Sequence, residues 1–160
     1  MTNHVELRNV TKQFGSQKAV NQVDLVLKAG ESVGMAGHNG AGKSTIMKLI
    51  LGLITPTEGE VMLLGERTGS KAGALLRSQI GYLPETVALH PSLTGIETMD
   101  FYAKLKKQPL SKNRELLERV GISQAARRRV GTYSKGMRQR LALAQALLGE
   151  PKVLLFDEPT

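Results

Sequence analysis

The sequence predicts an α/β fold, in which apolar strands alternate with amphipathic helices. Two observations support this prediction. A short, mostly apolar run at residues 32–36 leads through a glycine-rich segment into a helix whose apolar residues recur three or four positions apart. A second apolar run, at residues 153–156, ends in two acidic residues and is typical of a buried parallel strand.

The chain before the first apolar run predicts an antiparallel β subdomain. Val5, Leu7 and Val10 alternate with polar residues, and residues 20–27 alternate in much the same way, as expected for two half-buried antiparallel strands. Phe14 stands between these strands, beside Gly15. An exposed aromatic ring at this position could stack on a purine base, and a core position is the alternative.

Residues 37–45 fit the pattern G-x-x-x-x-G-K-[S/T] of a phosphate-binding loop without a mismatch. The glycines allow successive backbone N–H groups to point at one anion, and the helix that follows directs its positive end toward the same anion. In such a loop the lysine reaches the β- and γ-phosphates, and the next hydroxyl binds a bridging Mg2+. The predicted nucleotide site therefore contains Gly37, His38, Asn39, Gly40, Ala41, Gly42, Lys43, Ser44 and Thr45, with Ser44 also as a metal ligand.

The segment after this helix returns to the sheet. The sequence indicates a turn at residues 56–59, a strand at 60–65, a short helix near 71–78 and a strand at 80–83 that Pro84 ends. Glu85 follows the end of that strand. Because open α/β sheets place ligand contacts at strand ends, Glu85 is a candidate binding residue.

Residues 86–132 predict a helical subdomain inserted between sheet strands. Thr94 and Glu97 have the spacing of a capping box before a helix that extends to Lys107, and a second helix is expected over 111–120. The predicted plan is therefore a core of residues 1–85 and 133–160, with the helical subdomain at 86–132.

Another helix is expected after Tyr133, with an apolar face of leucine and alanine residues between 141 and 148. Lys135, Arg138 and Arg140 crowd its positive end, at a cost of about 0.3–1 kcal/mol each against the helix dipole. A bound anion would remove this conflict. Side chains that simply point into solvent are the alternative.

Asp157 and Glu158 follow the second apolar strand. In a phosphate-loop enzyme, the first carboxylate at such a strand end lies beside the Mg2+, and the second polarises the attacking water. We therefore expect Asp157 to be a metal ligand, and Glu158 and Lys43 to be catalytic.

Composition restricts the remaining functions. The chain has 160 residues, 41% of them hydrophobic, no cysteine and a formal net charge of +8. Its length suits one globular domain, and the lack of cysteine excludes disulfides and thiolate metal sites. No apolar run is long enough to span a bilayer. Because lysine and arginine are spread along the chain, we expect no direct contact with nucleic acid.

The order of these motifs resembles the ATP-binding subunit of ABC transporters over the whole chain. The resemblance implies a P-loop NTPase core that binds ATP and Mg2+, with Phe14 stacked on adenine. It also implies that residues 133–137 replace the family's L-S-G-G-Q signature, which contacts the γ-phosphate of a nucleotide held by a partner subunit. Ser134 and Gly136 match that signature, whereas Lys135 and Met137 depart from it. Glu85 stands where the family usually has glutamine.

The variant residues indicate a narrower likeness. His38, residues 83–85, residues 90–95 and the Tyr-Ser-Lys-Gly-Met form resemble the ATPase subunit of the transporter that matures nitrous oxide reductase, a family associated with export of copper or a sulfur species. His38 itself is interpreted as solvent-facing and not as a copper ligand. One alternative is the ATPase of another ABC-2-type exporter for a drug, lipid or polysaccharide. An alternative of another class is a soluble ABC ATPase that acts on nucleic acid or ribosomes.

The resemblance also implies partners and a location. We expect a homodimer of ATP-binding subunits, an integral membrane permease and, as a further candidate, a periplasmic partner. The expected location is peripheral, on the cytoplasmic face of the inner membrane. The family's D-loop and switch histidine follow the second apolar strand, whereas His4, His38 and His90 all precede it. We therefore expect a C-terminally truncated ABC ATPase domain, which alone binds nucleotide without efficient turnover.

Overall fold

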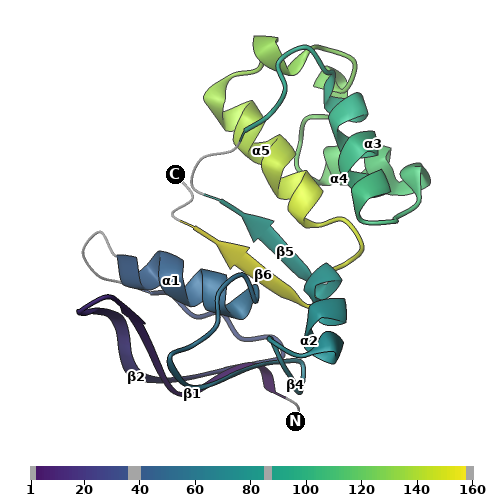
Figure 1. Ribbon diagram of the computed structural model, residues 1–160. Coiled ribbons are helices and arrows are strands. Elements are labelled where there is room, and N and C mark those ends of the chain that lie inside the picture. Colours follow the sequence, from purple (N-terminus) through teal and green to yellow (C-terminus); the bar gives the residue numbers. More distant parts are fainter. Residues whose placement is uncertain (1–2, 36–40, 85–87, 158–160) are drawn as a thin grey trace. The chain divides into compact units, whose positions relative to one another are not determined.

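The computed structural model describes residues 3–35, 41–84 and 88–157 (Figure 1). The chain divides into two compact units, Met1–Arg77 and Ser78–Thr160. The first unit is built mainly on an antiparallel sheet, and the second combines a parallel pair of strands with packed helices. The α/β class that the sequence predicted is confirmed.

The sheet of the first unit has four strands in the order β2-β1-β3-β4. β1 (Asn3–Phe14) pairs antiparallel with both β2 (Gln17–Lys28) and β3 (Glu58–Leu63), and β4 (Glu66–Arg67) pairs antiparallel with β3. The two predicted N-terminal strands are therefore confirmed. Alternate apolar side chains of β1 and β3 are buried in the core of this unit, among them Val5, Leu7, Val61 and Leu63.

Two helices complete the described part of the first unit. α1 (Ala41–Ile50) packs on β2 and β3 and buries Leu49 and Ile50. α2 (Lys71–Leu75) begins at Ser70, whose Oγ accepts a hydrogen bond from the backbone N–H of Gly73 at 3.0 Å. A 3-10 turn (Leu76–Gln79) follows α2.

The strand predicted for residues 32–36 is wrong for the part that the structure describes. Residues 31–35 form no strand, and Val33 is exposed. A strand persists only where a neighbouring strand accepts and donates its backbone hydrogen bonds, and neither described sheet includes these residues.

The second unit contains the parallel pair of β5 (Ile80–Leu83) and β6 (Val153–Phe156), in the register Ile80 to Val153. The chain between them forms α3 (Gly95–Leu105), α4 (Asn113–Arg119) and α5 (Lys135–Ala146). Three 3-10 turns connect these helices, at Leu110–Lys112, Ser123–Ala125 and Val130–Thr132. The expected helix over 111–120 is therefore a 3-10 turn followed by a shorter α-helix.

One hydrophobic cluster holds the three helices of the second unit together. α3 packs on both α4 and α5, and α5 also packs on β5. Fully buried members of the cluster include Met99, Leu117, Ile122 and Leu141. The division into a core of 1–85 and 133–160 and an insert at 86–132 stays a prediction.

The strand β6 is buried on one face only. Val153 and Leu155 are buried, whereas Leu154 and Phe156 are each 40% exposed. The expectation of a fully buried strand is therefore wrong within this unit, whose own side chains cover only the face of Val153 and Leu155. None of the helices that the structure describes combines the length and the apolar character needed to cross a bilayer.

Candidate functional site

The first part of the candidate site is the start of α1. The helix begins at Ala41, so Gly42, Lys43 and Ser44 occupy its first turn, which contains no acidic residue. The positive end of the helix dipole lies in this turn and favours an anion, and Lys43 contributes a positive charge from the same turn. Thr45 is buried and Ser44 is partly exposed. Gly37, His38, Asn39 and Gly40 lie outside the described residues.

Gly42 fixes the start of α1 against the sheet. A Cβ atom at Gly42 would lie 3.0 Å from the backbone oxygen of Ala19 in β2, closer than side chains normally approach a carbonyl. Because the neighbouring atom belongs to the backbone, it cannot turn away as a flexible side chain can. Only a glycine therefore lets the first turn of α1 approach β2 this closely without strain.

Phe14 is the last residue of β1, and its side chain is 51% exposed. The alternative of a core residue is therefore wrong. The Lys12 Nζ atom lies 5.3 Å from the ring centroid, within the range of a cation–π contact. An exposed ring meets the first requirement for stacking on a base, and the adenine contact itself stays a prediction.

In the second unit, the carboxyl ends of β5 and β6 meet at one edge. Leu83 pairs with Phe156, and the backbone N–H of Asp157 then donates to the Leu83 oxygen at 2.9 Å. This bond fixes the backbone of Asp157 beside the end of β5. Burial, followed by the negative charge of Asp157, raises the pKa of Tyr82. Glu85 and Glu158, predicted for the same edge, lie outside the described residues.

The start of α5 presents a second candidate phosphate contact. Ser134 is the N-cap, and its Oγ accepts a hydrogen bond from the backbone N–H of Met137 at 3.2 Å. Gly136 is exposed, and a Cβ atom there would meet only the Ser134 Oγ, at 4.0 Å. Space for an incoming group therefore remains at this helix end.

The three basic residues at the start of α5 are all exposed. Arg138 also donates to the backbone oxygen of Gly131 at 3.3 Å. Their exposure agrees with the alternative of side chains that point into solvent, and an anion contact at this helix end stays a prediction. Tyr133, just before the helix, is buried and donates its hydroxyl to the Ala125 oxygen, and burial raises its pKa. Tyr133 therefore anchors the segment from the inside, a role that the sequence did not indicate.

The site residues are distributed over both units. Phe14, Lys43 and Ser44 belong to the first unit, and Asp157 and Ser134 belong to the second. A hydroxyl and a carboxylate are the hard oxygen donors that Mg2+ prefers, and Mg2+ in nucleotide sites commonly takes one or two protein ligands together with phosphate oxygens. Ser44 and Asp157 fit this role by donor type, and their sharing of one metal ion stays a prediction.

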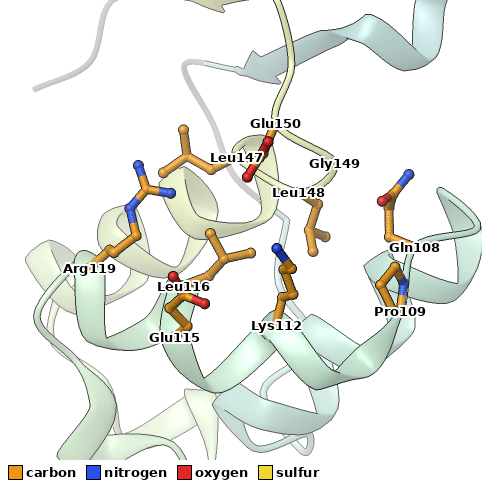
Figure 2. A pocket seen from close by; sticks show the side chains of 10 residues that line it. All are labelled: Gln108, Pro109, Lys112, Glu115, Leu116, Arg119, Leu147, Leu148, Gly149 and Glu150. Atoms are coloured by element: carbon orange, nitrogen blue, oxygen red, sulfur yellow. The ribbon is translucent and has the colours of Figure 1, made fainter.

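The second unit also contains a cavity of about 210 Å3, beside α4 and the turn between α5 and β6 (Figure 2). Its lining includes Lys112, Glu115, Arg119, Leu148, Gly149 and Glu150. This volume lies below the roughly 300–1,000 Å3 of sites for drug-sized ligands, and no predicted site residue lines it. The cavity therefore does not serve as the nucleotide site.

Comparisons with known proteins agree on one family. The family model "ABC transporter" matches residues 20–160. The chain is 40% identical over 159 residues to the uncharacterized ABC transporter ATP-binding protein YxlF of Bacillus subtilis. This alignment covers 97% of the chain and 52% of the relative. It is 38% identical over 164 residues to the bacitracin transport ATP-binding protein BcrA of Bacillus licheniformis, covering 100% of the chain and 52% of the relative.

A solved structure gives the same result. The structure of cbiO1 from Clostridium perfringens, described as part of the ABC transporter complex cbiONQ, superposes with a TM-score of 0.86 at 27% identity. That comparison covers 100% of this chain and 67% of the cbiO1 chain. The chain spans about half the length of the two curated relatives.

Proposed function

We propose, since this chain belongs to the ABC transporter family, that the whole protein is the ATP-binding and ATP-hydrolysing subunit of a membrane transporter. The observation that carries the proposal is the start of α1. There the residues G-K-S of the phosphate-loop pattern occupy the first turn of a helix without an acidic residue, so that Lys43, the helix dipole and the backbone N–H groups all favour phosphate.

Each predicted residue has one role in this proposal. Lys43 neutralises the terminal phosphates, and Phe14 stacks on adenine. Ser44 and Asp157 would hold Mg2+, which would neutralise part of the phosphate charge. Glu158 orients the attacking water and accepts its proton. Glu85, which follows β5 in the sequence, is proposed as a further residue of the nucleotide-binding site.

A second copy of the subunit completes the site. The start of α5 is exposed and open at Gly136, as a surface must be if its phosphate is held by another molecule. Ser134 and Gly136 would contact the γ-phosphate bound by the partner, and the partner would do the same in return. The proposal therefore includes a homodimer with two shared nucleotides.

The insert at residues 86–132 is proposed to dock on a permease at the cytoplasmic face of the inner membrane. α3 leaves Phe101 and Leu105 exposed by 52% and 64%, and Lys104 and Lys107 are exposed near them. Lys106 is a different case, because its Nζ donates to the backbone oxygen of Gln145. Lys106 is therefore not counted with the exposed residues of this face. A periplasmic partner remains a further proposal.

Two narrower proposals differ in the molecule that the transporter carries. The relative named for bacitracin transport favours an exporter of a drug or similar molecule. Nitrous oxide reductase maturation, with export of copper or a sulfur species, rests only on variants such as Glu85, Lys135 and Met137. Stimulation of ATPase activity in the reconstituted transporter, by bacitracin or by copper, would distinguish them.

The central test is the variant Lys43→Ala in the full-length protein. We expect ATP affinity or turnover to fall by about 100-fold or more, because the loop would lose the cation that opposes the phosphate charge. Lys48→Ala is the matched control, since Lys48 is an exposed residue in the last turn of the same helix. Nucleotide titration and phosphate release would be measured for both variants. Binding and turnover that survive Lys43→Ala would overturn the proposal.

A further inference from the structure

Lys106 connects the end of α3 to the end of α5. It is the C-cap residue of α3, and its Nζ donates to the backbone oxygen of Gln145 at 2.7 Å. Gln145 lies in the last turn of α5, where its oxygen also accepts from the backbone N–H of Leu148 at 3.3 Å and where α5 has no basic residue of its own. A cation at this end is favoured by the helix dipole. Lys106 thus supplies from another helix the charge that α5 lacks.

The same end of α5 is attached to β5. The Gln145 Nε2 donates to the backbone oxygen of Tyr82 at 3.1 Å. One residue earlier in β5, Gly81 lies so close to α5 that any Cβ atom there would overlap the backbone oxygen of Ala146. Gln145 is buried, although it interrupts an otherwise apolar run of leucine and alanine. Its amide is therefore used for a specific contact with the sheet.

These contacts continue to the carboxyl edge of the parallel pair. Tyr82 pairs with Leu155, Leu83 pairs with Phe156, and the N–H of Asp157 donates to the Leu83 oxygen. The path from Lys106 to Gln145 and from Gln145 to Tyr82 consists of hydrogen bonds, and it reaches Asp157 through the peptide bond from Tyr82 to Leu83 and the hydrogen bond at the Leu83 oxygen. It joins α3 to the strand that carries the predicted metal ligand.

The opposite end of α5 carries Ser134 and Gly136. The helix has 12 residues, which corresponds to a length of about 18 Å. A tilt of about 3° at the C-terminal end would move the N-terminal end by about 1 Å. A displacement of about 1 Å at a reacting group can lower a rate by about 100-fold.

We propose that Lys106 is a positioning residue, which sets the orientation of α5 and thereby places Ser134 and Gly136 for hydrolysis. This inference rests on the proposed function as an ATPase. It differs from a purely stabilising role, because loss of the Lys106 contact should lower turnover while leaving ATP binding at α1 unchanged.

The test compares three variants of the full-length protein in its transporter complex. Lys106→Met keeps the aliphatic stem and removes the donor, Lys106→Arg keeps a cationic donor, and Lys71→Met removes an exposed charge from α2, which carries no predicted site residue. We expect Lys106→Met to lower kcat by about 10-fold or more with KM for ATP within about 2-fold of wild type. We expect Lys106→Arg to restore most of kcat and Lys71→Met to have no effect.

Hydrogen exchange gives a readout that needs no turnover. In Lys106→Met, the backbone amides at residues 135–138 should exchange faster than in wild type, and those of α1 should not change. Wild-type kcat in Lys106→Met would overturn the inference, and so would a loss that Lys106→Arg fails to restore. A wild-type complex without ATPase activity would instead contradict the proposed function. In that case, unchanged exchange at residues 135–138 would overturn the positioning role separately.

Discussion

α3 and α5 begin in the same way and then differ at the third helical position. Thr94 caps α3 and Ser134 caps α5, and each hydroxyl oxygen accepts a hydrogen bond of 3.2 Å from the backbone N–H three residues later. In α3 the third residue is Glu97, whose carboxylate accepts from the backbone N–H of Thr94 at 2.9 Å. In α5 the third residue is Met137, and the first turn contains no acidic residue.

This difference separates capping from anion binding. The Glu97 carboxylate accepts a hydrogen bond from a backbone donor and offsets the positive end of the α3 dipole, so the start of α3 does not attract a further anion. The start of α5 keeps its positive potential, which exposed Lys135 reinforces. A helix that needed only stability would gain from a carboxylate at Met137. The absence of a carboxylate in this turn supports the proposed contact between the start of α5 and a phosphate.

The variant Met137→Glu would give α5 the capping box of α3, and we expect this change to have the largest effect. A carboxylate placed beside the predicted γ-phosphate contact should lower ATP-dependent dimer formation by about 10-fold or more, because like charges repel. Met137→Gln is the control, since it removes the same thioether without adding charge. Gel filtration of the full-length protein with ATP and Mg2+ would measure the dimer. Equal dimer formation by both variants would remove the distinction between the two helices.

Thr94→Ala tests the capping box of α3, and we expect a smaller effect. Loss of the N-cap oxygen should lower the free energy of unfolding by about 0.5–2 kcal/mol, because the N–H of Glu97 loses its acceptor. ATP affinity should not change. Urea unfolding and nucleotide titration would measure the two quantities, with Thr94→Ser as the control that keeps the hydroxyl. A loss of ATP affinity in Thr94→Ala would show that α3 is not merely structural at its start.

The smallest expected effect is the pH response of the α3 cap. The hydrogen bond from the Thr94 backbone holds the pKa of Glu97 below its ordinary value of 4.5. A lowered pKa in the folded state stabilises the protein above pH 4.5, and this contribution is lost as the pH falls through the lower folded-state pKa. Glu97→Gln keeps an acceptor without the ionisation. Thermal unfolding at pH 7 and at about pH 3 should therefore show a slightly smaller acid-induced loss for Glu97→Gln than for wild type.

Features with a local cause could be predicted from the sequence. The capping box of Thr94 and Glu97, the helix that starts at the phosphate loop and the strands before it all depend on residues close together in the chain. The position of Asp157 at the end of a strand parallel to β5 followed from an apolar run and its acidic end.

Features that depend on distant partners could not be predicted in this way. Lysine is usually a surface residue, so the sequence gives no sign that Lys106 has a buried partner. Only the packing of α3 on α5 brings its Nζ to Gln145. The same holds for Gln145 and Tyr82, which lie far apart in the sequence. The strand expected at residues 32–36 failed for a related reason, since apolar character alone does not supply a neighbouring strand.

The parallel pairing of β5 with β6 has a consequence for the order in which the second unit folds. In the sequence, α3, α4 and α5 lie between the two strands, so pairing β5 with β6 closes a long loop of chain. Closing this loop lowers the conformational entropy of the chain before the hydrogen bonds between the strands can stabilise the pair. Contacts among α3, α4 and α5 are more local and shorten that loop when they form. The helical cluster is therefore expected to form first, and the edge that positions Asp157 to form last.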